Sequence, residues 1–279
     1  MKSLARNLLL TVPFVRELKD TVKETRANVA HLQSELNHLR MVMAESRLAT
    51  DGRKLDEILA LLKPMKVVGF DKIRLGADHD GGYVMLDDFS GVTRAYSLGI
   101  YTEVSWDCAM ADRGIRVSQF DYSIDKTPVP RPEFTFHKKR VESLADLGLA
   151  AQPGQILKID IEGSEWGLFR QAAPGELPCF HQIFGEFHDF DRFYESAWQQ
   201  TAVAALRRLN ETHQLIHVHG NNWAPSFDTG KLKLPVSLEL TYASKSKYKF
   251  AETDEKFPGP LDRPNIRHRP DPPLDALWT

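Results

Sequence analysis

The chain has 279 residues, enough for one large domain with an appendage, since a domain usually takes roughly 100–200 residues. Its 36 basic and 38 acidic side chains give a formal net charge of -2, which excludes a whole-protein preference for nucleic acid. Two cysteines exclude a disulfide framework and match no spaced zinc motif, so the composition is typical of a reducing compartment.

The N-terminal segment carries a heptad repeat. Position a holds Val15, Val22, Val29, Leu36 and Met43, and position d holds Leu18, Thr25, Leu32, Leu39 and Ser46. This pattern predicts a coiled coil that joins copies of the chain, and valine at a with leucine at d favours a parallel dimer. Thr25 and Ser46 are polar residues that weaken the seam between the helices, and a trimer remains an alternative. A long amphipathic helix packed on its own domain is the alternative.

The apolar run before the heptads, residues 8–15, is short and contains Pro13, so it predicts neither a membrane-spanning helix nor a secretory signal. We expect a cytoplasmic protein, with the membrane periphery as a further location. Asp51-Gly52 interrupts the heptads, and a short helix is expected from there to Lys63-Pro64. We therefore divide the chain into a helical oligomerisation segment, residues 1–63, and a globular domain with a proline-rich, extended tail, residues 64–279.

Strands and helices alternate after Pro64. Seven strands are predicted at residues 94–100, 117–124, 134–141, 155–161, 181–187, 213–219 and 236–243. Helices are predicted at residues 103–114, 141–149, 165–173 and 196–210, and a hairpin with a tight turn at Asp80-Gly81-Gly82 precedes the sheet. The pattern predicts an α/β fold, with a mostly parallel seven-stranded sheet covered by helices on both faces and its last two strands as an antiparallel hairpin at the sheet edge.

Ligands of open α/β sheets bind outside the carboxyl ends of the strands. The first predicted strand ends near Ser97, Gly99 and Tyr101, where a glycine lets the backbone approach a ligand. Asp121 ends the second strand, about 20 residues further on, the spacing at which an acid holds a ribose diol. These residues indicate a cofactor that contains a nucleoside, although an aspartate there could instead cap a helix. The missing G-x-G-x-x-G fingerprint disfavours a nicotinamide dinucleotide.

Acidic and imidazole groups end the later strands. Asp160 follows the fourth strand, Glu186 and His188 end the fifth, and His217 and His219 end the sixth. Such groups can take a proton near neutral pH, and Asp160, Glu186 and His188 would also suit one Mg²⁺ or Mn²⁺. Glu162 and Glu165 are predicted to be a loop residue and a helix-start acid, because acids in the first turn complement the helix dipole.

Five motifs resemble one enzyme family. The segments LKIDIEGSEW (157–166) and IFGEFHDF (183–190) resemble the signature of FkbM-type S-adenosylmethionine-dependent methyltransferases. The segments RLGADHDGGYVML (74–86), AYSLGIYTEVSWDCAMADRGIRVSQFDYSI (95–124) and HVHGNNW (217–223) resemble a related methyltransferase-like branch. The resemblance spans roughly residues 70 to 270. It implies a Rossmann-like seven-stranded sheet (class I) with an antiparallel last strand, and methyl transfer to oxygen, often on sugars or polysaccharides.

The resemblance also implies roles for single residues. Ser97, Gly99, Ile100 and Tyr101 would face the methionine and ribose part of S-adenosyl-L-methionine, Asp121 would hold the ribose hydroxyls, and Ser123 would border the adenine with residues 136–141. Asp160 would lie beside the sulfonium, while Glu186, His188 and His219 would line the acceptor side as catalytic residues. One glycine stands where many methyltransferases have two or three. The turn from Asp78 to Tyr83 could cover the cofactor or be a plain hairpin turn.

The function predicted from the sequence is O-methylation of a hydroxyl group on a sugar in a glycan, with His188 and Glu186 as the preferred base pair. A hydroxyl is a weak acid, so a base or a metal must help to remove its proton. Two alternatives stay open: a metal-dependent hydrolase on the same scaffold, and a non-catalytic coiled-coil adaptor with a degenerate methyltransferase domain.

Overall fold

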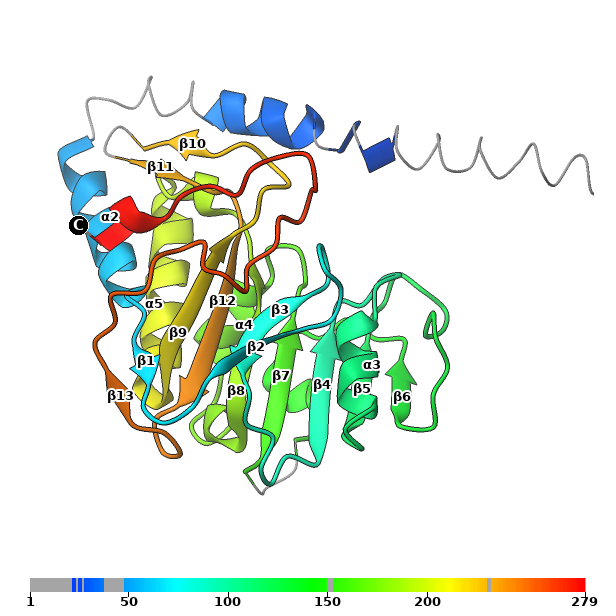
Figure 1. Ribbon diagram of the computed structural model, residues 1–279. Helices are drawn as coiled ribbons and strands as arrows, with labels where there is room; N and C mark the ends of the chain where they lie inside the picture. Colours follow the sequence, from blue (N-terminus) through cyan, green and yellow to red (C-terminus); the bar gives the residue numbers. More distant parts are fainter. Residues whose placement is uncertain are drawn as a thin grey trace, which may run out of the picture.

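The computed structural model describes residues 22–23, 25–26, 28–37, 48–149, 153–229 and 232–278. Residues 28–37 are helical, and the heptad residues Val22, Val29, Leu32 and Leu36 are exposed. Heptad positions 15, 18, 39, 43 and 46 lie outside the described residues. Coiled-coil pairing with a second copy therefore stays a prediction. In Figure 1 this helix, in blue, runs above the end of the sheet, and Asn37 bonds to Asp191 and Tyr194 of the globular part.

A seven-stranded mixed sheet forms the centre of the molecule (Figure 1). Its strands are β4 (Arg94–Leu98), β5 (Arg116–Phe120), β6 (Phe134–His137), β7 (Gln155–Ile159), β8 (Phe180–Phe187), β9 (His213–Gly220) and β12 (Leu238–Ser244). The spatial order is β6-β5-β4-β7-β8-β12-β9. The first five strands in this order are parallel, and β12 is antiparallel to both of its neighbours. The predicted α/β class with a mostly parallel seven-stranded sheet is thus confirmed.

The last two strands form an antiparallel hairpin at the sheet edge, as predicted, with β12 as its inner strand. Strand β12 is inserted between β8 and β9, so that β9 is the edge strand. The chain between them forms a small ribbon of β10 (Phe227–Asp228) and β11 (Lys233–Leu234). All seven residues of β12 are buried: Leu238, Leu240 and Tyr242 share one face, and Glu239, Thr241 and Ala243 share the other.

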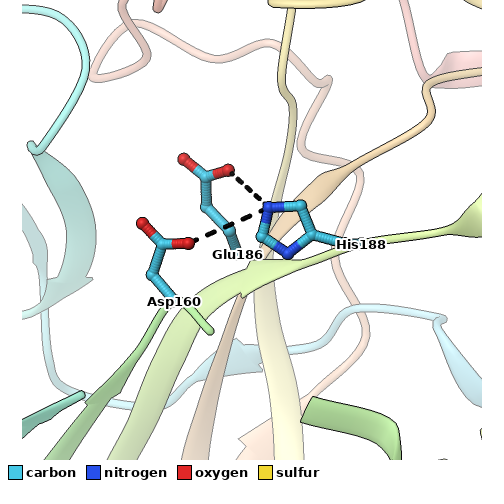
Figure 2. A group of neighbouring side chains, drawn as sticks. All are labelled: Asp160, Glu186 and His188. Atoms are coloured by element: carbon cyan, nitrogen blue, oxygen red, sulfur yellow. Dashed lines mark ion pairs between the residues drawn. The ribbon is translucent and has the colours of Figure 1, made fainter. Parts of the chain in front are cut away.

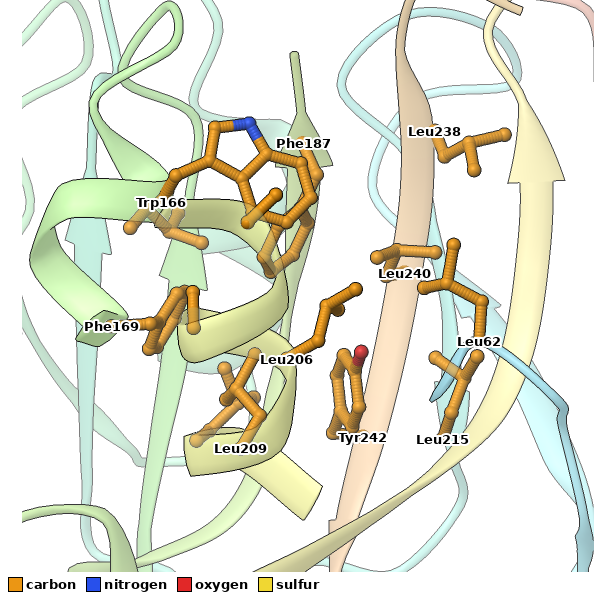
Figure 3. Packing of buried hydrophobic residues seen from close by; sticks show 14 of the residues in the cluster. Leu62, Trp166, Phe169, Phe187, Leu206, Leu209, Leu215, Leu238, Leu240 and Tyr242 are labelled. Atoms are coloured by element: carbon orange, nitrogen blue, oxygen red, sulfur yellow. The ribbon is translucent and has the colours of Figure 1, made fainter. Parts of the chain in front are cut away.

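One face of the sheet packs against the helices α2 (Leu48–Leu61), α4 (Glu165–Gln171) and α5 (Ser196–Thr212). Figure 3 shows Leu206 and Leu209 of α5 near Tyr242 of β12, with Phe169 and Trp166 of α4 further along the same layer. All five side chains are buried. Burying one such side chain contributes roughly 1.5–3 kcal/mol, so this layer is the main source of stability.

Helix α2 differs from its prediction. It begins at Leu48 and includes Asp51 and Gly52, which were expected to separate the heptads from this helix. A glycine inside a helix costs about 1 kcal/mol, less than the gain from burying Leu55 and Ile58 in the core. The helix therefore packs on the globular part, although the boundary predicted between residues 63 and 64 stays a prediction.

The helix predicted at residues 141–149 is a single 3₁₀ turn, η2 (Leu144–Leu147). Ser143 and Asp146 form a capping box at its start, and Gly148 ends it with a φ of 60°. A start signal and a stop signal this close leave no room for an α-helix. Three further 3₁₀ turns are η3 (Leu177–Cys179), η4 (Phe190–Arg192) and η5 (Asp275–Trp278).

The other face of the sheet is covered by helix α3 (Ser105–Ala111) and by a hairpin of β2 (Lys72–Leu75) and β3 (Tyr83–Leu86). Figure 1 shows β2 and β3 crossing in front of the sheet. Residues 252–274 continue this cover without helix or strand, after the pairing of β1 (Lys66–Val67) with β13 (Phe250–Ala251). Among the described residues, no helix combines the length and apolar character needed to cross a membrane.

Candidate active site

The carboxyl ends of β4, β7, β8 and β9 lie at one edge of the sheet, because these strands run in the same direction. Strand β12 runs the opposite way, so its first residues, including Glu239, lie at this edge too. The predicted site residues Gly99, Asp160 and His188 follow the ends of β4, β7 and β8. The fold therefore gathers them at the edge where such sheets bind ligands.

Gly99 allows a close approach between the loop after β4 and the end of β7. Its φ is +71°, and a Cβ there would lie 1.6 Å from the carbonyl oxygen of Asp160. The Asp160 N–H donates to the Leu98 carbonyl at 3.0 Å, and Lys158 Nζ donates to the Gly99 carbonyl at 2.7 Å. The loop predicted to meet the cofactor is thus in direct contact with the predicted catalytic acid.

Asp121 holds the shape of this loop. Its Oδ2 accepts hydrogen bonds from the N–H groups of Ile100 (3.1 Å) and Tyr101 (2.8 Å), and its Oδ1 accepts from the N–H and hydroxyl of Ser123 (2.7 and 2.6 Å). Burial would raise the pKa of Asp121, but these hydrogen bonds outweigh it and lower the pKa. A carboxylate has about four acceptor positions, so a ribose diol could bind only by replacing a donor, such as the rotatable Ser123 hydroxyl.

The other predicted cofactor residues differ in position. Ser97 is buried, and its hydroxyl donates to Asp107 at 3.2 Å, away from the loop. The side chain of Ile100 is buried, whereas Tyr101 is exposed and has a φ of 37°. Of the three side chains, only that of Tyr101 can reach a ligand without rearrangement.

Asp160, Glu186 and His188 point toward one another (Figure 2). His188 Nε2 lies 3.4 Å from Glu186 Oε2 and 3.8 Å from Asp160 Oδ1. The Glu186 oxygen also accepts from Asn221 Nδ2 at 2.9 Å. The Asp160 side chain is 28% exposed and that of His188 17%, so the group is open to solvent on one side. The structure thus brings these three predicted residues into one cluster.

Glu165 orients His188, a role that the sequence reasoning missed. Its side chain is fully buried, and its Oε1 lies 3.2 Å from His188 Nδ1. Its two oxygens also accept hydrogen bonds from the N–H groups of Ile161 (2.9 Å) and Gly163 (3.0 Å). Glu165 does begin α4, as predicted, but it fixes the imidazole as well. The one sequence signal was its place five residues after Asp160.

The three cluster residues have shifted pKa values. Burial raises the pKa of Glu186 to about 8, helped by the charge of Asp160, and burial raises that of Asp160 to about 6. Burial would lower the pKa of His188, but contacts with Glu165 and Glu186 outweigh it and raise the pKa well above its ordinary value. These contacts therefore favour the protonated form of the imidazole. Perturbed groups of this kind cluster at functional sites.

His219 does not belong to this cluster. It is completely buried, with Nδ1 3.0 Å from Glu239 Oε2 and Nε2 3.2 Å from Asp271 Oδ2 of the C-terminal tail. Strand β12 separates it from Glu186, because Glu239 lies opposite both residues in the sheet. In this arrangement an acceptor could reach His219 only if the tail moved.

The hairpin turn before β3 lies over the same edge. Gly81 packs against the side chain of Glu103, and its carbonyl accepts from Ser105 Oγ at 3.3 Å. Burial raises the pKa of Asp80, and the charge of Glu239 adds to this effect. Tyr83 is 3% exposed, and after burial the charges of Asp160 and Glu186 contribute most to raising its pKa. The turn therefore brings Asp80 and Tyr83 close to the cluster.

Comparisons with known proteins show little similarity. No family model matches the chain, and no curated protein matches its sequence. One solved structure with some similarity is a medium-resolution structure of the bifunctional kinase-methyltransferase WbdD. The TM-score is 0.32 and the sequence identity 13%, and the match covers 72% of this chain and 39% of that chain. A second is WbdD with the kinase inhibitor LY294002, with a TM-score of 0.31, 11% identity, and coverage of 76% and 46%. The chain spans less than half the length of these WbdD chains, and such scores assign no family.

Proposed function

We propose that this protein is an S-adenosylmethionine-dependent O-methyltransferase that acts on a hydroxyl group of a sugar in a glycan. One observation carries the proposal: the Gly99 loop, with its predicted cofactor residues, touches Asp160 of the acid and imidazole cluster. A methyltransferase needs these two halves side by side, because the acceptor oxygen, the methyl group and the sulfur must be aligned. The antiparallel last strand of the sheet agrees with the family that the motifs resemble. The sugar acceptor rests on that resemblance.

The residues of the Gly99 loop would hold the cofactor. Bound S-adenosylmethionine would supply a methyl group on a cationic sulfur. Gly99 leaves room for a close approach of a ligand to the backbone, and Asp121 keeps the following amides in place. Asp160, whose side chain is 28% exposed and whose backbone touches Gly99, offers a carboxylate that favours a neighbouring positive charge.

The proton of the acceptor hydroxyl group would pass to the cluster of Asp160, Glu186 and His188, which acts as one unit. Glu165 fixes the ring of His188, so that Nε2 faces Glu186 and Asp160. Because the contacts of His188 favour its protonated form, a proton must move from His188 to a carboxylate or to solvent before the ring can act as a base. Asp160, with a pKa of about 6, is ionised at neutral pH and is ready to accept a hydrogen bond from the hydroxyl group.

Calorimetry tests the cofactor half of the proposal. Titration of S-adenosylmethionine into the full chain should release heat, and Asp121→Ala should weaken binding at least tenfold because the loop amides lose their acceptor. Asp254→Asn changes an exposed carboxylate elsewhere and is the control. Transfer of a labelled methyl group to a panel of nucleotide sugars and oligosaccharides then tests the chemistry. His188→Ala should reduce turnover by at least a hundredfold while cofactor binding stays within about threefold.

A metal-dependent hydrolase is the second candidate, favoured by the Asp160, Glu186 and His188 cluster, which offers three metal-ligating atoms. A hydrolase would not explain why Asp121 holds the Gly99 loop in place. A calorimetric titration with no heat from S-adenosylmethionine, at protein concentrations up to about 100 µM, would reject the methyltransferase proposal and leave the hydrolase.

A further inference from the structure

The cluster of Asp160, Glu186 and His188 has the spacing of a metal centre. One ligand atom from each residue lies within 4.8 Å of the other two. Ligands about 2.1 Å from a metal, at right angles to one another, are about 3 Å apart. The distances of 3.4 and 3.8 Å from His188 Nε2 to the two carboxylates come within 1 Å of that value. Small side-chain rotations would therefore complete the geometry.

We propose that Asp160, Glu186 and His188 bind one divalent cation, Mn²⁺ in preference to Mg²⁺, and that Glu165 positions the imidazole ligand. The proposal goes beyond the methyl transfer proposed above and does not depend on it. Two carboxylates and one imidazole are hard and intermediate donors, which suit Mn²⁺. The open side of the cluster leaves room for water or an acceptor oxygen to complete the coordination.

The contacts around the ligands support this assignment. Histidines that bind metals usually donate their second ring N–H to a carboxylate. Glu165 is placed to accept such a bond from His188 Nδ1, and two backbone N–H groups fix its own position. Nε2 is therefore the ring nitrogen turned toward Asp160 and Glu186 (Figure 2). Asn221 likewise fixes Glu186 by donating to its Oε2.

Carboxyl groups gather at this edge. Asp160 interacts electrostatically with Glu162 and Glu165, and Glu186 interacts with Asp160 and Glu239. Lys158 Nζ, 3.9 Å from Asp160 Oδ2, is a described cation beside them. A bound metal would need a neutral Nε2 on His188, so that this nitrogen could bind the ion.

Titration of Mn²⁺ into the EDTA-treated full chain, followed by electron paramagnetic resonance, tests the site without any need for activity. We expect one Mn²⁺ per chain with a Kd in the micromolar range. Asp160→Asn and Glu186→Gln should each weaken binding at least tenfold. Asp254→Asn, which removes the charge of an exposed carboxylate outside the cluster, is the control and should leave the Kd within twofold. Far-UV circular dichroism checks that each variant is folded.

Glu165→Gln separates the positioning role from direct binding. It should weaken Mn²⁺ binding about 10- to 100-fold with an unchanged stoichiometry of one. In pulsed resonance spectra the bound Mn²⁺ should show coupling to an imidazole nitrogen, and His188→Gln should remove it. The proposal is overturned if the full chain takes up no Mn²⁺ below 1 mM, if Asp160→Asn and Glu186→Gln bind it as tightly as the original chain, or if the nitrogen coupling survives in His188→Gln.

Discussion

Replacing Gly99 by alanine should destabilise the protein far more than the same change at Gly91. Both glycines have a positive φ, +71° and +75°, so each alanine would cost about 1–2 kcal/mol in backbone strain. This cost is partly offset, by about 0.4–1 kcal/mol, because alanine restricts the unfolded chain. Nothing lies within 4 Å of a Cβ at Gly91. We therefore expect Gly91→Ala to lower the free energy of unfolding by no more than about 1.6 kcal/mol.

At Gly99 the added methyl group would lie 1.6 Å from the carbonyl oxygen of Asp160, so one of the two segments must move. That movement would break or strain the hydrogen bonds from Gly99 N to Phe120 O (2.9 Å) and from Asp160 N to Leu98 O (3.0 Å). Each such bond contributes about 1 kcal/mol. With the backbone strain, and after the same offset from the unfolded chain, the loss should be about 2–4 kcal/mol.

Urea denaturation followed by tryptophan fluorescence measures both losses under the same conditions. The difference between the two variants should be at least about 2 kcal/mol. Equal losses at the two positions would show that the contact between the Gly99 loop and Asp160 is absent in solution, and the description of the candidate site would then be wrong.

Three further predictions concern other parts of the molecule. Burial would lower the pKa of His219, but the charge of Glu239 and contacts with Asp271 raise it to about 10, so its stabilising contribution is complete below pH 6.5 and is lost as the pH rises toward 10. The free energy of unfolding should fall by up to about 1.4 kcal/mol per pH unit between pH 7 and 9.5 through this group, and His219→Gln, unlike the exposed His268→Gln, should remove that slope in urea titrations. Leu206→Ala should lower the free energy of unfolding by about 2–5 kcal/mol in the same assay, because it opens a cavity between α5 and the sheet. A loss below about 1 kcal/mol would contradict the packing in Figure 3. Leu32 is an exposed heptad residue, so Leu32→Asp should convert a dimer of the chain to a monomer with little change in the stability of the globular domain. Light scattering measures the molar mass, and a monomeric original chain would contradict the coiled-coil prediction.

Most of the sheet could be predicted because its signal is local. The strand predicted at residues 155–161, for example, is observed at Gln155–Ile159, because a continuous apolar run with turn residues on each side allows few other structures. The pairing of β12 with β9 was predicted as a hairpin, but its pairing with β8 was not, because β8 is distant along the chain and no local pattern shows the contact. Helix α2 likewise depends on packing that outweighs its internal glycine.

The part of the candidate site that could be predicted consists of residues at the ends of predicted strands. Asp160, Glu186 and His188 follow strands that end at the same edge, and the cluster follows from that. Glu165 was undervalued because its place in the first turn of α4 already explained an acid, and its contact with His188 depends on the fold. His219 was expected on the acceptor side, but the tail that carries Asp271 covers it, and no local pattern shows where that tail packs.

The interior place of β12 has a consequence for synthesis on the ribosome. Strand β9 leaves the ribosome before β12 but has no neighbour in the sheet until β12 arrives, because β12 lies between it and β8. A nascent chain that ends before Ser244 would therefore carry β8 with one side unpaired, and β9 with both its sides unpaired, as open templates for other chains. The sheet can close only after residues 238–244 have emerged, so a ribosome stalled before that point would display a chain prone to aggregation.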